Sequence, residues 1–157
     1  MGLMFFPDAD KALNHLFRVT KPGGKCFITT WYRLEHLEIA ERLVRRLRPD
    51  QQASSTPLKF WQLPWDEPEY LKAQLSKSGF RDCGVQTRLE YILYPGKMGL
   101  DFGAENLPKL YAKLITLKDE AEEEKWNQLW REELERENYS NGDVRLKMWA
   151  NIAWGTK

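Results

Sequence analysis

Several features are scarce in this chain of 157 residues, and each scarcity excludes a class of protein. Its only cysteines, Cys26 and Cys83, have no metal-ligand spacing, so we expect free thiols in a reducing compartment such as the cytoplasm and no metal site. The 24 basic and 23 acidic residues leave a net charge of +1, which gives no support for a nucleic-acid or membrane partner. No apolar run has the length of a membrane span, and the N-terminus lacks the features of a signal peptide.

Recognisable catalytic sets are missing as well. The sequence shows no Ser/His/Asp set and no carboxylate pair, so the catalytic residues are unknown. The only histidines, His15 and His36, fall in predicted helices, where we expect structural roles. The ten glycines form no Gly-x-Gly-x-Gly motif, the kind of loop that lets a backbone approach a cofactor closely. The sequence therefore offers no recognisable cofactor-binding residues.

The composition that remains is that of a globular protein. Hydrophobic residues make up 42% and charged residues 30% of the chain, and its length suits one domain with a core, residues 1–157. Seven tryptophans are many for this length. They favour a pocket with aromatic walls, although Trp126 and Trp130 lie at helical spacing and are expected in the core.

The N-terminal segment predicts a helix, a turn and a strand. Asp8 is placed to cap a helix with apolar residues at Ala12, Leu13, Leu16 and Phe17. Pro22-Gly23-Gly24 then predicts a tight turn. The run from Cys26 to Thr30 favours a strand and barely alternates, which predicts that both of its faces are covered. Together these elements form half of a βαβ unit and indicate an α/β fold.

The rest of the chain predicts further helices and strands. Asp66 and Glu69 have the spacing of a capping box at the start of a helix, and Asn141-Gly142-Asp143 predicts a turn. A break is expected at Pro95, Gly96, Gly99 and Gly103. Apolar periodicity predicts helices over 34–47, 107–115 and 119–136, and alternation predicts strands over 85–93 and 144–154.

The segment Arg18-Val19-Thr20-Lys21-Pro22-Gly23-Gly24 resembles a known motif. Class I S-adenosylmethionine-dependent methyltransferases of the type 11/25-like group usually carry Arg-Val-Leu-Lys-Pro-Gly-Gly there, so Thr20 is the one departure. In that family the motif links the fourth sheet strand to the fifth. Residues 65–82 are similar to the family's next helix and the turn into strand six, and residues 145–157 are similar to strand seven.

This resemblance implies the C-terminal portion of a Rossmann-like methyltransferase fold. The expected sheet is a mixed three-strand sheet in the order 5-7-6, with strand seven antiparallel to its neighbours. Residues 33–64 and 95–143 would be insertions that form a helical lid. Strands one to three, most of strand four and the N-terminal cofactor-binding half would be absent. The implied cofactor is S-adenosylmethionine, and we expect no binding by this chain alone.

An absent strand four would leave strand five with an unpaired edge. Such an edge invites association, so we expect a homo-oligomer or a partner subunit that completes the sheet. The segment from Leu3 to Phe6 is an alternative partner, folding back as a remnant of strand four.

The family resemblance also places a substrate pocket, over the carboxyl ends of strands four and five. Carried over by position, the candidate residues are Phe6, Asp8, Trp31, Tyr32, Arg33 and, from the lid, Trp61. Aromatic walls suit a flat organic acceptor, such as an aromatic or polyketide-like compound of secondary metabolism.

Three functional interpretations stay open at this point. The chain is an inactive piece of a methyltransferase, one subunit of a split methyltransferase, or a cofactor-free protein. In the third case a small-molecule-binding or pericyclase-like protein keeps the pocket and uses its shape. All three include a small-molecule ligand.

Overall fold

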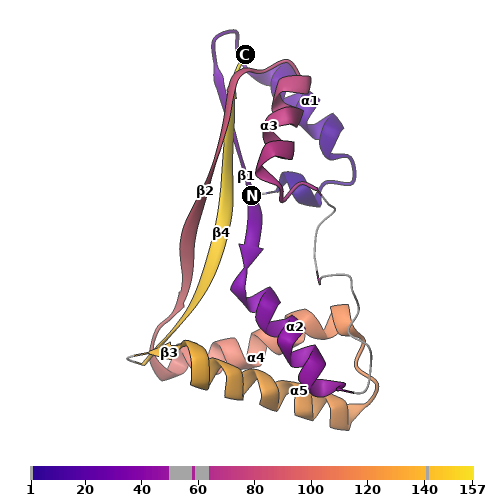
Figure 1. The fold of residues 1–157 in the computed structure, drawn as a ribbon, viewed down its shortest axis with the longest axis vertical. Coiled ribbons are helices and arrows are strands. Elements are labelled where there is room, and N and C mark those ends of the chain that lie inside the picture. Colours follow the sequence, from indigo (N-terminus) through magenta and orange to yellow (C-terminus); the bar gives the residue numbers. More distant parts are fainter. Residues whose placement is uncertain (1, 50–57, 59–63, 141) are drawn as a thin grey trace. The chain divides into compact units, whose positions relative to one another are not determined.

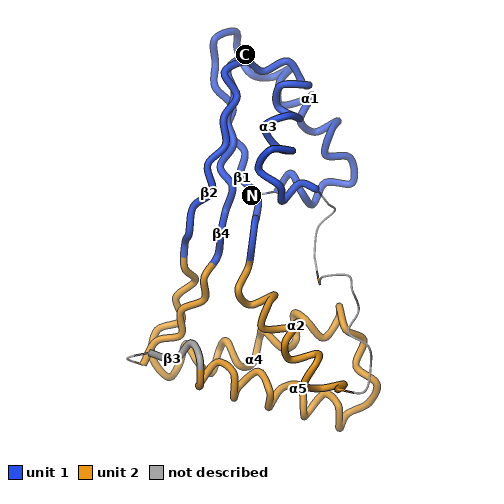
Figure 2. The backbone as a smooth tube through the Cα atoms, viewed as in Figure 1, with its two compact units in different colours: residues 1–33, 59–90, 148–157 blue, residues 34–58, 91–147 orange. Residues whose placement is uncertain are grey.

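The computed structural model describes residues 2–49, 58, 64–140 and 142–157, and the side chains of 137–140 are not described. The single domain expected from length divides into two compact units (Figure 2). Unit 1 comprises residues 1–33, 59–90 and 148–157, and unit 2 comprises residues 34–58 and 91–147. Unit 2 overlaps the expected insertions, and their role as a lid stays a prediction. Within the described residues, no helix is both long and apolar enough to cross a membrane.

Helices and strands are interspersed along the chain (Figure 1). Their order is η1 (Leu3–Phe5), α1 (Ala9–Val19), β1 (Lys25–Leu34), α2 (Glu35–Leu47), α3 (Pro68–Lys77), β2 (Arg81–Tyr94), α4 (Gly96–Ile115), α5 (Glu120–Glu133), η2 (Leu134–Asn138), β3 (Tyr139–Ser140) and β4 (Asp143–Thr156).

The sheet has the strand order β1-β4-β2, and the two-residue β3 pairs with β4. This order agrees with the one expected for the three predicted strands; β3 was not predicted. The start of β1 lies beside the end of β4, because Gly23 N–H donates to Lys157 O at 2.8 Å and Lys157 N–H donates to Gly24 O at 2.9 Å. Strands β1 and β4 are therefore antiparallel. The three-strand sheet is antiparallel, which agrees with the orientation expected for strand seven beside its neighbours, although the sheet was expected to be mixed.

Helices α1 and α3 of unit 1 pack together and cover one face of the sheet (Figure 1). The rings of Phe17 and Phe80 meet edge to face at 5.0 Å. Along β1, Cys26 and Ile28 are buried, whereas the intervening Phe27 is 63% exposed. The prediction that both faces of this strand are covered is therefore wrong, since the described helices cover one face and Phe27 is exposed.

The start of the chain and the end of β1 also differ from expectation. Leu3–Phe5 forms a turn of 3₁₀ helix, η1, and not a strand remnant. Strand β1 continues to Leu34, past the expected end at Thr30. Within it, Trp31 N–H donates a hydrogen bond to Met4 Sδ at 3.4 Å. Trp31, Tyr32 and Arg33 are thus strand residues and do not follow the strand.

Helix α3 begins without the expected capping box. Its N-cap residue is Glu67, with no side-chain cap, and Pro68 starts the helix with its fixed φ angle. Asp66 is buried, and its backbone carbonyl accepts a hydrogen bond from Asn151 Nδ2 at 2.7 Å. Asn151 Oδ1 also accepts from the Thr87 hydroxyl at 2.7 Å. A buried amide on β4 therefore joins the segment before α3 to strand β2.

Unit 2 is a helical cluster in which α5 packs against α2 and α4. The periodicity that predicts a helix over 34–47 is confirmed by α2, which buries Leu37, Ala40 and Leu47. Trp126 and Trp130 are fully buried, which confirms that they belong to the core. Their rings meet edge to face at 5.8 Å, and Trp126 Nε1–H donates to Pro108 O at 3.1 Å.

The break expected at the glycines before residue 107 is absent, because α4 begins at Gly96 and includes them. At Gly99 a Cβ atom would lie 2.2 Å from the backbone carbon of Tyr94. Glycine is required here by the close approach of the chain entering the helix, and it does not end the helix.

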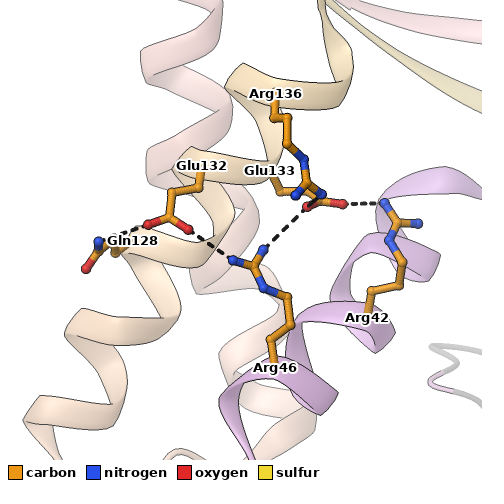
Figure 3. A network of polar contacts seen from close by, with 6 residues as sticks. All are labelled: Arg42, Arg46, Gln128, Glu132, Glu133 and Arg136. Carbon is orange, nitrogen blue, oxygen red and sulfur yellow. Dashed lines mark hydrogen bonds and ion pairs between the residues drawn. The ribbon is translucent and has the colours of Figure 1, made fainter.

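A buried carboxylate joins α2 to α5 within unit 2 (Figure 3). Glu133 has a side chain only 1% exposed and pairs with Arg42 at 2.5 Å, Arg136 at 2.9 Å and Arg46 at 3.6 Å. Arg46 also pairs with the exposed Glu132 at 3.1 Å. Three guanidinium groups thereby offset the desolvation of one carboxylate.

Candidate functional site

A cavity of about 740 Å³ lies in unit 1 between η1, α1 and β1. Its size falls in the range of small-molecule sites, ~300–1,000 Å³. Apolar side chains form most of its wall, with a few polar groups among them. The lining residues are Gly2, Leu3, Phe6, Pro7, Asp8, Lys11, Ala12, His15, Leu16, Phe27, Ile28 and Thr29.

One face of α1 forms part of the wall of this cavity. Asp8, Ala12 and Leu16 follow at intervals of four residues, and such residues share a helix face. Asp8 is fixed in place because its Oδ1 accepts from Lys11 N–H at 2.8 Å, the N-cap of α1. The helix therefore begins at the cavity, with a carboxylate at its first turn.

His15 is the other group lining the cavity that is suited to proton transfer. Arg18 donates to His15 Nε2 at 2.9 Å, and a guanidinium has no acceptor, so that nitrogen accepts. The remaining ring nitrogen, Nδ1, carries the proton in the neutral ring. No set of metal-binding side chains occurs in the part of the chain that the structure describes.

Aromatic side chains supply the exposed apolar surface at the cavity. The side chain of Phe6 is 51% exposed and that of Phe27 is 63% exposed. Phenylalanine side chains are usually buried in a core, so both exposures are high. Exposed aromatic rings beside a cavity are typical of a surface that binds something. The arrangement suits an apolar ligand with a few polar groups and offers no built catalytic set.

The structure brings together two of the six candidate residues. Phe6 and Asp8 both line the cavity. Trp31, Tyr32 and Arg33 do not line it, and Trp61 lies outside the described residues. The substrate roles of all six stay predictions.

The three residues at the end of β1 have other surroundings. The Arg33 guanidinium lies 4.7 Å from the ring centre of Trp149 on β4, a cation–π contact. Tyr32 is 47% exposed. Because β1 continues through these residues, their side chains alternate between its two faces and do not converge at a strand end.

Sequence reasoning missed Lys11, His15 and Phe27 as lining residues. A signal for the first two was present: Lys11 and His15 are four apart, three and seven residues after Asp8, and so belong near one face of the helix. No comparable signal existed for Phe27, since its exposure depends on which strand face the helices cover.

A second polar pair, in unit 2, is buried and structural. The His36 ring hydrogen-bonds the hydroxyl of Tyr111, whose ring stacks on Trp130 at 5.5 Å. Burial lowers the pKa of His36 to about 4 and raises the pKa of Tyr111. The two residues are 7% and 0% exposed. The structural role expected for His36 stays a prediction.

No protein-family model matches the chain. Among solved structures, the chain is similar to phosphoethanolamine N-methyltransferase 2 of Haemonchus contortus, solved with phosphomonomethylethanolamine and S-adenosylhomocysteine. The identity is 18% and the TM-score 0.34, over 98% of this chain and 31% of the other. The chain thus spans about a third of the length of that solved protein.

Proposed function

We propose that this chain is the C-terminal, acceptor-side portion of a class I S-adenosylmethionine-dependent methyltransferase. It contributes to methyl transfer onto a small organic acceptor, and it is inactive without a cofactor-binding portion. Methyl transfer asks for alignment of the donor with the accepting atom, and for a general base where the acceptor needs one. A portion that shapes the acceptor pocket can therefore be separate from the portion that binds the donor.

The strand order carries this proposal. A helix, a Pro-Gly-Gly turn and a strand are followed by two strands that return in the order β1-β4-β2, with the last strand of the chain in the middle. The sequence resemblance implies the same 5-7-6 order. A meander of consecutive hairpins would place the strands in chain order, so this arrangement is a specific one.

The described residues do not fit S-adenosylmethionine. The one Gly-Gly pair is already engaged by the chain's C-terminal residue, because both backbone hydrogen bonds of Lys157 go to Gly23 and Gly24. This turn also precedes β1, whereas a cofactor loop follows a strand and opens a helix. The proposal therefore assigns the cofactor to residues other than those described.

The acceptor is assigned to the end of the cavity formed by Phe6 and Asp8. The half-exposed Phe6 ring offers a flat apolar wall, and the Asp8 carboxylate can accept a hydrogen bond from a hydroxyl or amine of the substrate. A small aromatic or polyketide-like compound matches these two groups. Asp8 is held by its N-cap bond to Lys11 N–H, so its assigned role is to position the small-molecule substrate.

Calorimetric titration with S-adenosylhomocysteine tests this proposal. The chain alone is compared with a hybrid in which the cofactor-binding half of a class I methyltransferase is joined ahead of Gly2. That half by itself is the control. We expect no binding by the chain, and binding by the hybrid about tenfold or more tighter than by the control half.

Two results would contradict the proposal. Micromolar binding by the chain alone would show that the cofactor site lies within it. A folded hybrid that binds no more tightly than the control half would show that the chain does not complete a methyltransferase.

A further inference from the structure

We propose that the open edge of β1 binds an extended peptide strand whose inward side chains are apolar and include one acidic residue. The strand would pair with the main chain at Phe27 and Thr29 and place its apolar side chains in the cavity. This inference rests on the geometry of unit 1 in the chain by itself. In the hybrid described under the proposed function, a strand of the cofactor-binding half would take the same edge, so the peptide and that half would exclude each other.

The main chain of β1 points into the cavity. Among the described residues, the order β1-β4-β2 gives strand β1 a neighbour on one side only. Trp31 N–H points away from β4, since it donates to Met4 Sδ at 3.4 Å. Backbone groups of alternate residues in a strand point to the same side, so those of Phe27 and Thr29 also face outward. Both residues line the cavity, which therefore lies along the free edge.

The length of the open edge is limited at one end. The turn η1 (Leu3–Phe5) occupies the edge near Trp31 through Met4, which is 1% exposed. The edge before that point stays open beside Phe27, 63% exposed, which flanks it on the face without helices. An added strand would thus cover a short stretch of β1 and would shield an exposed aromatic ring.

The cavity defines the chemistry of the side chains that enter it. Its wall toward α1 includes Ala12 and Leu16, which suit apolar side chains from every second residue of a strand. Lys11 lies in the same wall, and its ammonium group has no ion pair among the described residues. The Asp8 carboxylate in that wall is held by its N-cap bond to Lys11 N–H. An acidic residue on the inward face of the strand would pair with it.

A second copy of the chain fits this edge less well. Two copies joined edge to edge through β1 would be related by a two-fold axis perpendicular to the sheet. Their α1 helices would then lie on the same face, and each would flank the shared edge that its own Ala12 and Leu16 already line. A strand without an accompanying helix avoids this crowding.

The probe is an acetylated, amidated peptide of about seven residues that alternates threonine with valine and has one glutamate on the valine side. The control peptide has the same side chains, with methyl groups on the backbone nitrogens of the pairing edge. We expect the first to bind the full chain with a Kd of about 100 µM or tighter, and the control not to bind at about 1 mM. Hydrogen exchange at the amides of Phe27 and Thr29 should slow about tenfold in the complex.

A pair of charge-reversal variants tests the acidic position. Lys11→Glu should weaken binding about threefold to fivefold, whereas Lys21→Glu, the same change in the turn outside the cavity lining, should not. Equal effects of the two variants would contradict the assigned charge.

Three outcomes would overturn the inference. Binding that the methyl groups do not weaken would show a side-chain pocket without strand pairing. Absence of binding by the first peptide at about 1 mM would show that the edge is closed. Concentration-dependent dimerisation that protects the amides of Phe27 and Thr29 without peptide would assign the edge to a second copy.

Discussion

At the scale of single residues, two glycines of α4 should respond differently to replacement by alanine. A Cβ at Gly99 would meet the Tyr94 backbone at 2.2 Å, whereas a Cβ at Gly103 would meet the Leu134 side chain at 3.6 Å, an ordinary contact. Gly99→Ala should therefore lower the free energy of unfolding by about 2 kcal/mol or more. Gly103→Ala should be neutral or raise it by up to about 1 kcal/mol, because alanine favours a helix. Urea unfolding of both variants measures the difference, and equal effects would contradict the close approach.

The buried His36 makes stability depend on pH. Its pKa is lowered from 6.5 to about 4 by burial, so the folded protein keeps it neutral while the unfolded chain takes up a proton below pH 6.5. Its contribution is fully present above pH 6.5 and is lost as the pH falls toward 4. The loss reaches at most about 3 kcal/mol.

The measurement is urea unfolding at pH 7 and pH 4 for the natural chain and for His36→Gln. Other groups titrate in both proteins, so the difference between the two pH dependences isolates His36. The variant should lose less stability on acidification. An identical pH dependence would show that this histidine is not held neutral by burial.

At the scale of elements, Glu133 holds α5 to α2. Glu133→Gln would leave Arg42, Arg46 and Arg136 facing a neutral amide, and we expect a loss of about 2–3 kcal/mol. The neighbouring Glu132→Gln is the matched control, with an expected change below about 0.5 kcal/mol because Glu132 is exposed. Thermal unfolding of the two variants tests this. Similar melting temperatures would contradict a structural role for the buried carboxylate.

The elements were predictable where local pattern decides them. The three- and four-residue spacing of Leu37, Ala40 and Leu47 is sufficient to predict α2. Patterns failed where contacts formed in the folded chain decide. The sequence pattern predicts a break at Gly99, yet glycine is required there by the close approach of the Tyr94 backbone. The pattern also predicts that the strand ends before Trp31, yet β1 continues through this residue.

The candidate site was predictable only in part for the same reason. Phe6 and Asp8 were named from their position in the family resemblance, and both line the cavity. The exposure of Phe27 depends on helices covering only one face of β1, and no local pattern reports that. Sequence indicated the helix side of the cavity, whereas the strand side required the sheet topology.

At the scale of the whole molecule, the chain divides into two compact units, and the account centres on unit 1. In the described part of the chain, β1 lies at one edge of the sheet, beside the cavity and with the exposed ring of Phe27. An uncovered edge strand can pair with another chain and so promotes association or aggregation. The central claim is that this sheet is the C-terminal part of a larger methyltransferase sheet that continues beyond β1.

Hydrogen exchange at the amides of Phe27 and Thr29 tests that claim most directly. It is measured in the chain alone and in the hybrid that carries a cofactor-binding half ahead of Gly2. The account predicts exchange about tenfold or more slower in the hybrid, with further slowing when S-adenosylhomocysteine is added. Equal exchange at these two amides in the chain and in a folded hybrid would contradict it.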